Sequence, residues 1–171
     1  MTALLDLFQR RPRLVLALVA AISVAMLAFG MYLQHVQHLE PCPMCIVQRY
    51  ALIGVALVAG GAACFKNRFW LYGGVIKMGV LAAFGAFTAA RQSWLQWYPP
   101  EVLTCGRDFF GMIESFPLRR AVPMIFRGSG DCSVIDWTFL GLSIANWSFL
   151  WFAAFTAVAA VLWFKRPPAT A

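Results

Sequence analysis

Four long apolar runs are the dominant pattern of this 171-residue sequence. They cover residues 14–33, 46–65, 70–90 and 145–164, and each contains only a few polar side chains. A helix rises about 1.5 Å per residue, so roughly twenty apolar residues span the ~30 Å hydrocarbon core of a bilayer. The pattern therefore predicts four membrane-spanning helices.

The polar stretches between these runs differ greatly in length. Residues 34–45 and 66–69 are short connections, whereas residues 91–144 form a long loop before the last run. Between Phe109 and Phe126 apolar groups alternate with charges, and no piece is long enough to cross a bilayer. We expect a short segment here that lies on the membrane surface, apolar side down.

Composition agrees with a membrane protein. Apolar residues make up 61% of the chain and charged residues 12%, against roughly 45–50% and 25% in soluble domains. The predicted fold class is an all-α membrane protein, a four-transmembrane-helix bundle that forms a single domain over residues 1–171. The first run follows an arginine cluster, as a secretory signal would. It fills a whole bilayer, however, whereas a signal core is only about 7–15 residues, so we expect it to be retained.

Basic residues predict the orientation of the bundle. Residues 1–13, 66–69 and 165–171 contain Arg10, Arg11, Arg13, Lys66, Arg68, Lys165 and Arg166, whereas residues 34–45 contain no Lys or Arg. Because basic short segments stay in the cytoplasm, both termini and residues 66–69 are expected there, with 34–45 and 91–144 on the opposite side. The net charge of +7 is thus a topology signal, and we expect no nucleic-acid partner.

A Cys-x-x-Cys pair opens the second apolar run, in the stretch Pro41–Cys45. Its two prolines keep Cys42 out of a helix interior. A helix N-terminus and a nearby cation both favour thiolate over thiol, and Arg49 lies one helical turn beyond Cys45 on the same face. The stretch indicates a redox-active pair beside a guanidinium, with a structural metal site or two inert thiols as the alternatives.

The predicted topology sorts the five cysteines. Cys42, Cys45, Cys105 and Cys132 face the non-cytoplasmic side, where disulfides persist. Cys64 ends the second run and is expected to be a buried packing thiol. Cys42 and Cys45 can close locally, which leaves Cys105 for Cys132. That second bridge could be purely structural, worth roughly 3–4 kcal/mol. A cation near Cys105 instead suits it to thiol exchange, so the two pairs suggest a relay.

A relay of this kind needs a final electron acceptor. The sequence contains nothing that resembles a haem, iron–sulfur or flavin site, so a lipid-soluble quinone at the membrane interface fits best. Arg49 would then hold a quinone carbonyl and stabilise the anion formed on reduction. The alternative role for Arg49 is an anchor to lipid phosphate.

A metal-binding or metal-transporting protein is the alternative from another class. Zinc or copper ligands would come from His35, His38, Glu40, Cys42 and Cys45. These residues share one short, proline-stiffened loop, and the spans supply almost none of the ionisable groups that a transporter needs. We therefore predict no metal site and expect the histidines to be interfacial, with either able to touch a quinone head group.

The residues also match a known family over essentially the whole chain. The chain resembles the bacterial disulfide bond formation protein B (DsbB) family. The matching motifs are Gln34-His35-Val36, Pro41-Cys42 with Cys45, Arg49, Tyr98-Pro99, Thr104-Cys105, Gly130-Asp131-Cys132 and Trp137 with Phe139-Leu140-Gly141-Leu142. Pro43 departs from the pattern at a position where members vary. In a vitamin K epoxide reductase-like enzyme, the nearest rival, the active pair should lie further along the bundle.

The resemblance implies an enzyme, a protein-dithiol:quinone oxidoreductase in the bacterial inner membrane with its active cysteines facing the periplasm. Cys105 would form the mixed disulfide with reduced DsbA, and Cys132 would be its partner. Ubiquinone, or menaquinone under anaerobic conditions, would reoxidise Cys42 and Cys45. The expected quinone-binding residues are Cys45, Arg49 and His35. The DsbA–DsbB–quinone chain is the standard example of how the periplasm is kept oxidising, so this pathway comes from the resemblance alone.

Overall fold

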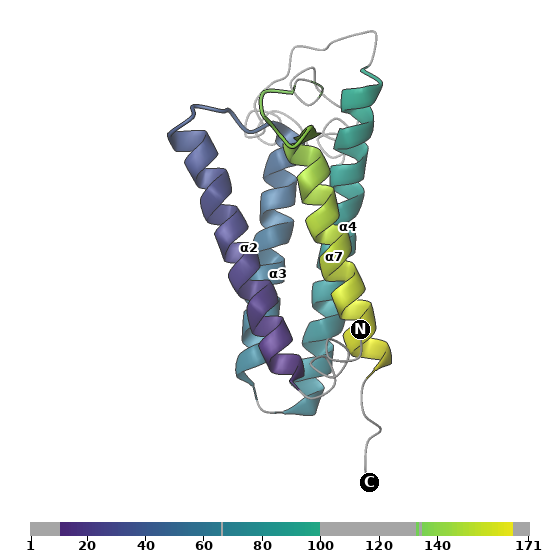
Figure 1. Ribbon diagram of the computed structural model, residues 1–171. Helices are drawn as coiled ribbons and strands as arrows, with labels where there is room; N and C mark the ends of the chain where they lie inside the picture. Colours follow the sequence, from purple (N-terminus) through teal and green to yellow (C-terminus); the bar gives the residue numbers. More distant parts are fainter. Residues whose placement is uncertain (1–10, 66, 100–132, 134, 166–171) are drawn as a thin grey trace, which may run out of the picture.

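The computed structural model describes residues 11–65, 67–99, 133 and 135–165. Four helices run up and down through this part of the chain (Figure 1). In chain order they are α2 (Pro12–His35), α3 (Pro43–Cys64), α4 (Arg68–Trp97) and α7 (Ile144–Phe164). Each is long and apolar enough to cross a membrane, which confirms the predicted four-helix membrane bundle. Cys105, Cys132 and the predicted surface segment lie outside the described residues.

The helices pack in a row that follows their order in the sequence. Extensive interfaces join α2 to α3, α3 to α4, and α4 to α7, whereas α2 meets α7 only slightly in the described part. The fully buried side chains at the centre include Leu16, Val55, Met78 and Phe152. Large apolar side chains such as Leu57 and Val80 point outward, 71% and 65% exposed. An apolar exterior of this kind is what a lipid-facing surface requires.

Two glycines allow the helix axes to approach closely. A Cβ added at Gly74 would lie 2.4 Å from Cβ of Ala62, and one added at Gly85 would lie 2.4 Å from the ring of Phe152. Both distances are far below van der Waals contact, so only glycine fits these two interfaces. Not every glycine of the bundle has this role, because a Cβ at Gly73 would meet no atom within 4 Å.

Helix α4 continues past the predicted end of the third span at Ala90 and reaches Trp97. Its 30 residues span about 45 Å, more than the thickness of a bilayer core. Hydropathy falls at Arg91, but the helix persists until Tyr98, the residue before Pro99, where proline disfavours the helical conformation. The aromatic side chains of Trp94 and Trp97 are exposed there, as at a membrane–water interface.

Helix α3 begins three residues before the predicted span, because proline is well suited to the first helical position. Pro43 occupies that position and Cys42 is the N-cap, with an extended backbone, as the prolines predict. At the other end, Cys64 is exposed. The expectation that Cys64 is buried was therefore wrong: as the last residue of α3, it lies where the helix ends and is not covered by the packed core.

A short hairpin precedes α7, within what the sequence predicts as loop. Strand β1 (Thr138–Phe139) pairs antiparallel with β2 (Leu142–Ser143), with Thr138 opposite Ser143. Leu140 and Gly141 form the turn with φ angles of 52° and 78°, the left-handed values that a two-residue hairpin turn requires. Ser143 then caps α7 by accepting a hydrogen bond from the backbone of Asn146.

Candidate redox site

The two cysteines of the Cys-x-x-Cys pair meet at the start of α3. Their Sγ atoms lie 2.8 Å apart, and the backbone N–H of Cys45 donates to Sγ of Cys42 at 3.3 Å. Cys42 is buried and Cys45 is half-buried. The N-cap position places Cys42 at the positive end of the helix dipole. The pair can therefore interconvert between dithiol and disulfide without rearrangement of the helix.

A cavity of about 800 Å³ lies beside the pair. It is lined by parts of α2, α3, α4 and α7, by the connection before α3, and by the segment around the hairpin. Cys45 and Arg49 both face it, so the expectation that these two side chains share one face of α3 is confirmed. Most of the remaining lining is apolar, and includes Met26, Leu33 and Phe152. Its size and apolar lining are typical of small-molecule sites.

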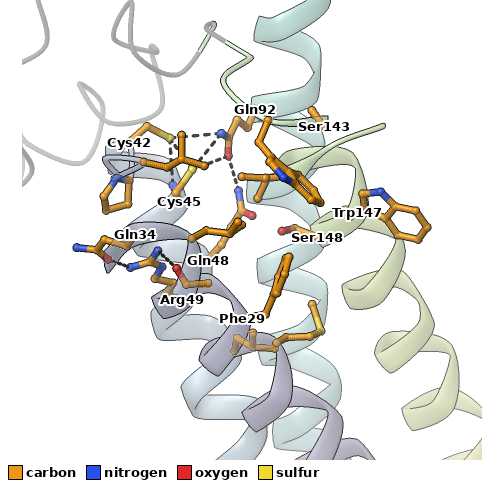
Figure 2. A pocket seen from close by; sticks show the side chains of 18 of the residues that line it. Phe29, Gln34, Cys42, Cys45, Gln48, Arg49, Gln92, Ser143, Trp147 and Ser148 are labelled. Carbon is orange, nitrogen blue, oxygen red and sulfur yellow. Dashed lines mark hydrogen bonds between the residues drawn. The ribbon is translucent and has the colours of Figure 1, made fainter. Parts of the chain in front are cut away.

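Arg49 is held from the opposite wall by α2. Its Nη1 donates to Oε1 of Gln34, and its Nη2 donates to the carbonyl oxygen of Gly30 at 3.1 Å (Figure 2). The side chain is half-buried, and the described part of the chain offers it no carboxylate partner. A guanidinium has five N–H donors, so Arg49 keeps donors and its positive charge for a ligand in the cavity.

Aromatic rings bridge α2 and α7 at this end of the bundle. The ring of Phe29 on α2 meets Trp137 edge-on at 5.8 Å, and Trp137 stacks on Phe139 at 6.1 Å. Phe139 in turn meets Trp147 of α7, whose Nε1 donates to the carbonyl oxygen of Phe139 at 3.1 Å. Since α2 and α7 barely touch directly, this aromatic chain links them at this end of the bundle, where its rings line the cavity.

Two glutamine side chains join the sulfur pair to α4. Nε2 of Gln92 donates to Sγ of Cys42 at 3.3 Å and to Sγ of Cys45 at 3.2 Å. Oε1 of Gln92 accepts from Nε2 of Gln48 at 2.7 Å and from Sγ of Cys45 at 3.7 Å. Figure 2 shows Gln92 directed at both sulfurs, with Gln48 below it. Both glutamines are buried.

Comparison with known proteins decides the family. The family model "Disulfide bond formation protein DsbB" matches residues 12–162. The chain belongs to the DsbB family. It is similar to "Disulfide bond formation protein B" of Acidovorax sp. (strain JS42), 64% identical over 93% of this chain and 91% of the relative. The protein of the same name from Polaromonas sp. (strain JS666 / ATCC BAA-500) is 67% identical over 92% and 94%. This DsbB-family chain is therefore a multi-pass membrane protein of disulfide bond formation.

Among the predicted site residues of this DsbB-family chain, the structure brings Cys42, Cys45 and Arg49 together at the cavity. It places His35 outside the cavity lining. His35 is the last residue of α2, is exposed, and is not among the cavity-lining residues. His38 is exposed too. No three His, Cys, Asp or Glu side chains of the described part gather as metal ligands. The roles of His35, Cys105 and Cys132 stay predictions.

Two residues at the sulfur pair, Gln48 and Gln92, are not predicted from the sequence. Gln92 lies beyond the third apolar run, and only the continuation of α4 carries it back over the sulfur pair. A weak signal was present in Gln48, a polar side chain at the start of an apolar run. Gln34 was noted within a family motif, and its contact with Arg49 now gives that residue a physical role.

Proposed function

We propose that this protein is a protein-dithiol:quinone oxidoreductase of the bacterial inner membrane. It would reoxidise a periplasmic dithiol oxidase of the DsbA type through Cys105 and Cys132. The electrons would pass to Cys42 and Cys45, and from there to ubiquinone, or to menaquinone under anaerobic conditions. The observation that carries the proposal is the shared cavity, in which Sγ of Cys45 and the guanidinium of Arg49 face the same space.

The cavity suits a quinone in shape, polarity and position. A quinone head group is a flat, largely apolar ring with two carbonyl oxygens, and the lining combines apolar and aromatic side chains with few polar groups. Arg49 supplies N–H donors for one carbonyl. The slight contact between α2 and α7 supports entry of an apolar tail sideways from the bilayer.

The reaction balances with two electrons and two protons per disulfide. The dithiol of the partner reduces the Cys105–Cys132 disulfide by thiol exchange, and that pair then reduces the disulfide of Cys42 and Cys45. Formation of the Cys42–Cys45 disulfide releases two electrons and two protons, which a quinone bound beside Cys45 would accept. Arg49 stabilises the negative charge that develops on the quinone oxygen, as a preorganised donor does in an oxyanion site.

The proposed orientation rests on charge and on the ends of the helices. The start of α2, the connection between α3 and α4, and the end of α7 lie at one end of the bundle, and the sulfur pair lies at the other (Figure 1). Basic residues flank the end that holds the start of α2 and the end of α7. The positive-inside rule then supports a periplasmic position for the sulfurs, where disulfides persist.

Steady-state turnover tests the proposal. Purified protein in detergent is mixed with a reduced DsbA-type dithiol protein and a soluble ubiquinone analogue, and loss of quinone absorbance is followed. We expect quinone reduction that requires the partner dithiol and stops when the cysteines are alkylated. Cys64→Ala is the control, since Cys64 lies at the far end of α3 from the pair, and it should turn over normally. An absence of turnover with an active partner and quinone would refute the proposal.

A further inference from the structure

We propose that Gln92 stabilises the reduced, thiolate form of the Cys42–Cys45 pair, and that Gln48 is the positioning residue that orients Gln92 for this task. The inference deepens the proposed function and rests on it in one respect, that this pair is the one reduced and reoxidised. It assigns to a neutral side chain of α4 a part in setting the redox equilibrium of two cysteines on α3.

Hydrogen bonding fixes the orientation of the Gln92 carboxamide. An amide has a donor end and an acceptor end. Nε2 of Gln48 donates to Oε1 of Gln92 at 2.7 Å, which leaves Nε2 of Gln92 directed at the sulfurs at 3.2 and 3.3 Å. With the Gln48 amide as it stands, the reversed Gln92 amide would set two NH₂ groups against each other. Gln48 therefore acts through Gln92, whereas Gln92 touches the reacting atoms.

The bonds to sulfur favour one redox state over the other. A hydrogen bond to an ionised acceptor is roughly twice as strong as one to a neutral acceptor. An N–H directed at a thiolate thus stabilises the reduced pair more than the same N–H stabilises the weakly accepting disulfide. Gln92 and Gln48 are only 4% and 6% exposed, so little water competes for these bonds and their electrostatic strength is preserved.

The Gln92 amide complements the other groups that favour thiolate here. The backbone N–H of Cys45 reaches Cys42 alone, at 3.3 Å, and the described hydrogen bonds of Arg49 run to Gln34 and Gly30 on α2. Gln92 reaches both sulfurs from a third helix. Loss of its N–H should destabilise the thiolate form and shift the equilibrium toward the disulfide, which makes the pair a weaker oxidant of its partner.

The test measures the thiol–disulfide equilibrium in full-length protein free of quinone. Cys64→Ala, Cys105→Ala and Cys132→Ala together form the background, so that only the pair at Cys42 and Cys45 reports. The protein is equilibrated with reduced and oxidised glutathione, which exchange two electrons with the pair, then acid-quenched and alkylated with a mass tag. The variants are Gln92→Met, which keeps the length of the side chain without an N–H, and Gln48→Met.

We expect Gln92→Met to shift the equilibrium constant about tenfold toward the disulfide, equivalent to a reduction potential about 30 mV more negative. Gln48→Met should shift it in the same direction by a smaller factor. The matched control is Gln96→Met on the same helix, because Gln96 accepts from Ser143 at 2.6 Å rather than contacting a sulfur, and it should stay within about twofold of the background.

An equilibrium constant for Gln92→Met that matches Gln96→Met would overturn the inference. If the methionine variant fails to fold, Gln92→Glu decides, because it keeps the size and polarity of glutamine but places an acceptor beside the sulfurs. It should shift the equilibrium toward the disulfide as well, and an unchanged value overturns the inference equally. The measurement needs no quinone, so a protein that fails to reduce quinone refutes the proposed function while leaving this result readable.

Discussion

Replacement of Arg49 by methionine separates a role in quinone chemistry from an anchoring role. Methionine keeps much of the volume but removes the positive charge and all five N–H donors. Two of these donors bind Gln34 and the carbonyl oxygen of Gly30, so the substitution also removes hydrogen bonds between α2 and α3 and lowers stability. The loss of activity beyond that caused by lower stability reports the interaction of Arg49 with the quinone.

The size of the effect follows from the hydrogen bonds involved. A hydrogen bond to a charged group contributes about 1.5–3 kcal/mol, which corresponds to about a tenfold to hundredfold change in an equilibrium or rate ratio. We therefore expect kcat/KM for the quinone to fall by about ten- to hundredfold in Arg49→Met. The apparent KM should rise because a donor to the quinone carbonyl is lost, and kcat should fall because negative charge develops on the quinone during reduction. Arg49→Lys should be intermediate, since an ammonium keeps the charge but not the planar fork.

The assay is the initial rate of ubiquinone-analogue reduction at saturating partner dithiol, with thermal unfolding in detergent measured alongside. Gln34→Met is the matched control, because it removes one of the two α2 partners of Arg49 while the charge stays in the cavity. It should lower stability by part of the loss in Arg49→Met, which removes both bonds, yet change kcat/KM far less. A kcat/KM for Arg49→Met equal to that of Gln34→Met would return Arg49 to the role of a lipid or helix anchor.

Three further predictions test other parts of the account. Gly85→Ala should destabilise the bundle by about 1–3 kcal/mol, because its Cβ would collide with the ring of Phe152. Thermal unfolding measures this against Gly73→Ala, whose added Cβ meets open space. Equal stability of the two variants would contradict the close packing at Gly85. Cys105→Ala should abolish oxidation of the partner dithiol while added quinone still oxidises the Cys-x-x-Cys pair, and equal loss of both half-reactions would count against the relay. Trp137→Ala should raise the apparent KM for quinone by removing the centre of the aromatic bridge, and an unchanged value would show that the bridge does not border the quinone.

The bundle and the core of the site were predictable because both depend on local periodicity. Four apolar runs of bilayer length leave helices as the only stable spanning form. A spacing of four residues puts Cys45 and Arg49 on one helix face, and the structure places both in one cavity. The position of Cys42 as N-cap likewise follows from the prolines on either side of it.

The features that the sequence did not predict depend on contacts between residues far apart in the chain. Gln48 and Gln92 are 44 positions apart, and their contact requires α4 to remain helical after its hydropathy falls. The hairpin turn places Leu140, a residue other than glycine, in a left-handed conformation, which local preference opposes. The exposure of Cys64 depends on which face of the last turn of α3 points outward, and an apolar run with little periodicity does not specify that.

The most direct test of the central claim is the stoichiometry of quinone reduction by the fully reduced protein, without any partner. Each dithiol yields two electrons and reduces one quinone. We expect that removing Cys105 and Cys132 halves the quinone consumed per protein, whereas removing Cys42 and Cys45 abolishes it. Quinone consumption that survives without Cys42 and Cys45, or that disappears without Cys105 and Cys132, would contradict the claim that the pair at the start of α3 delivers electrons to the quinone.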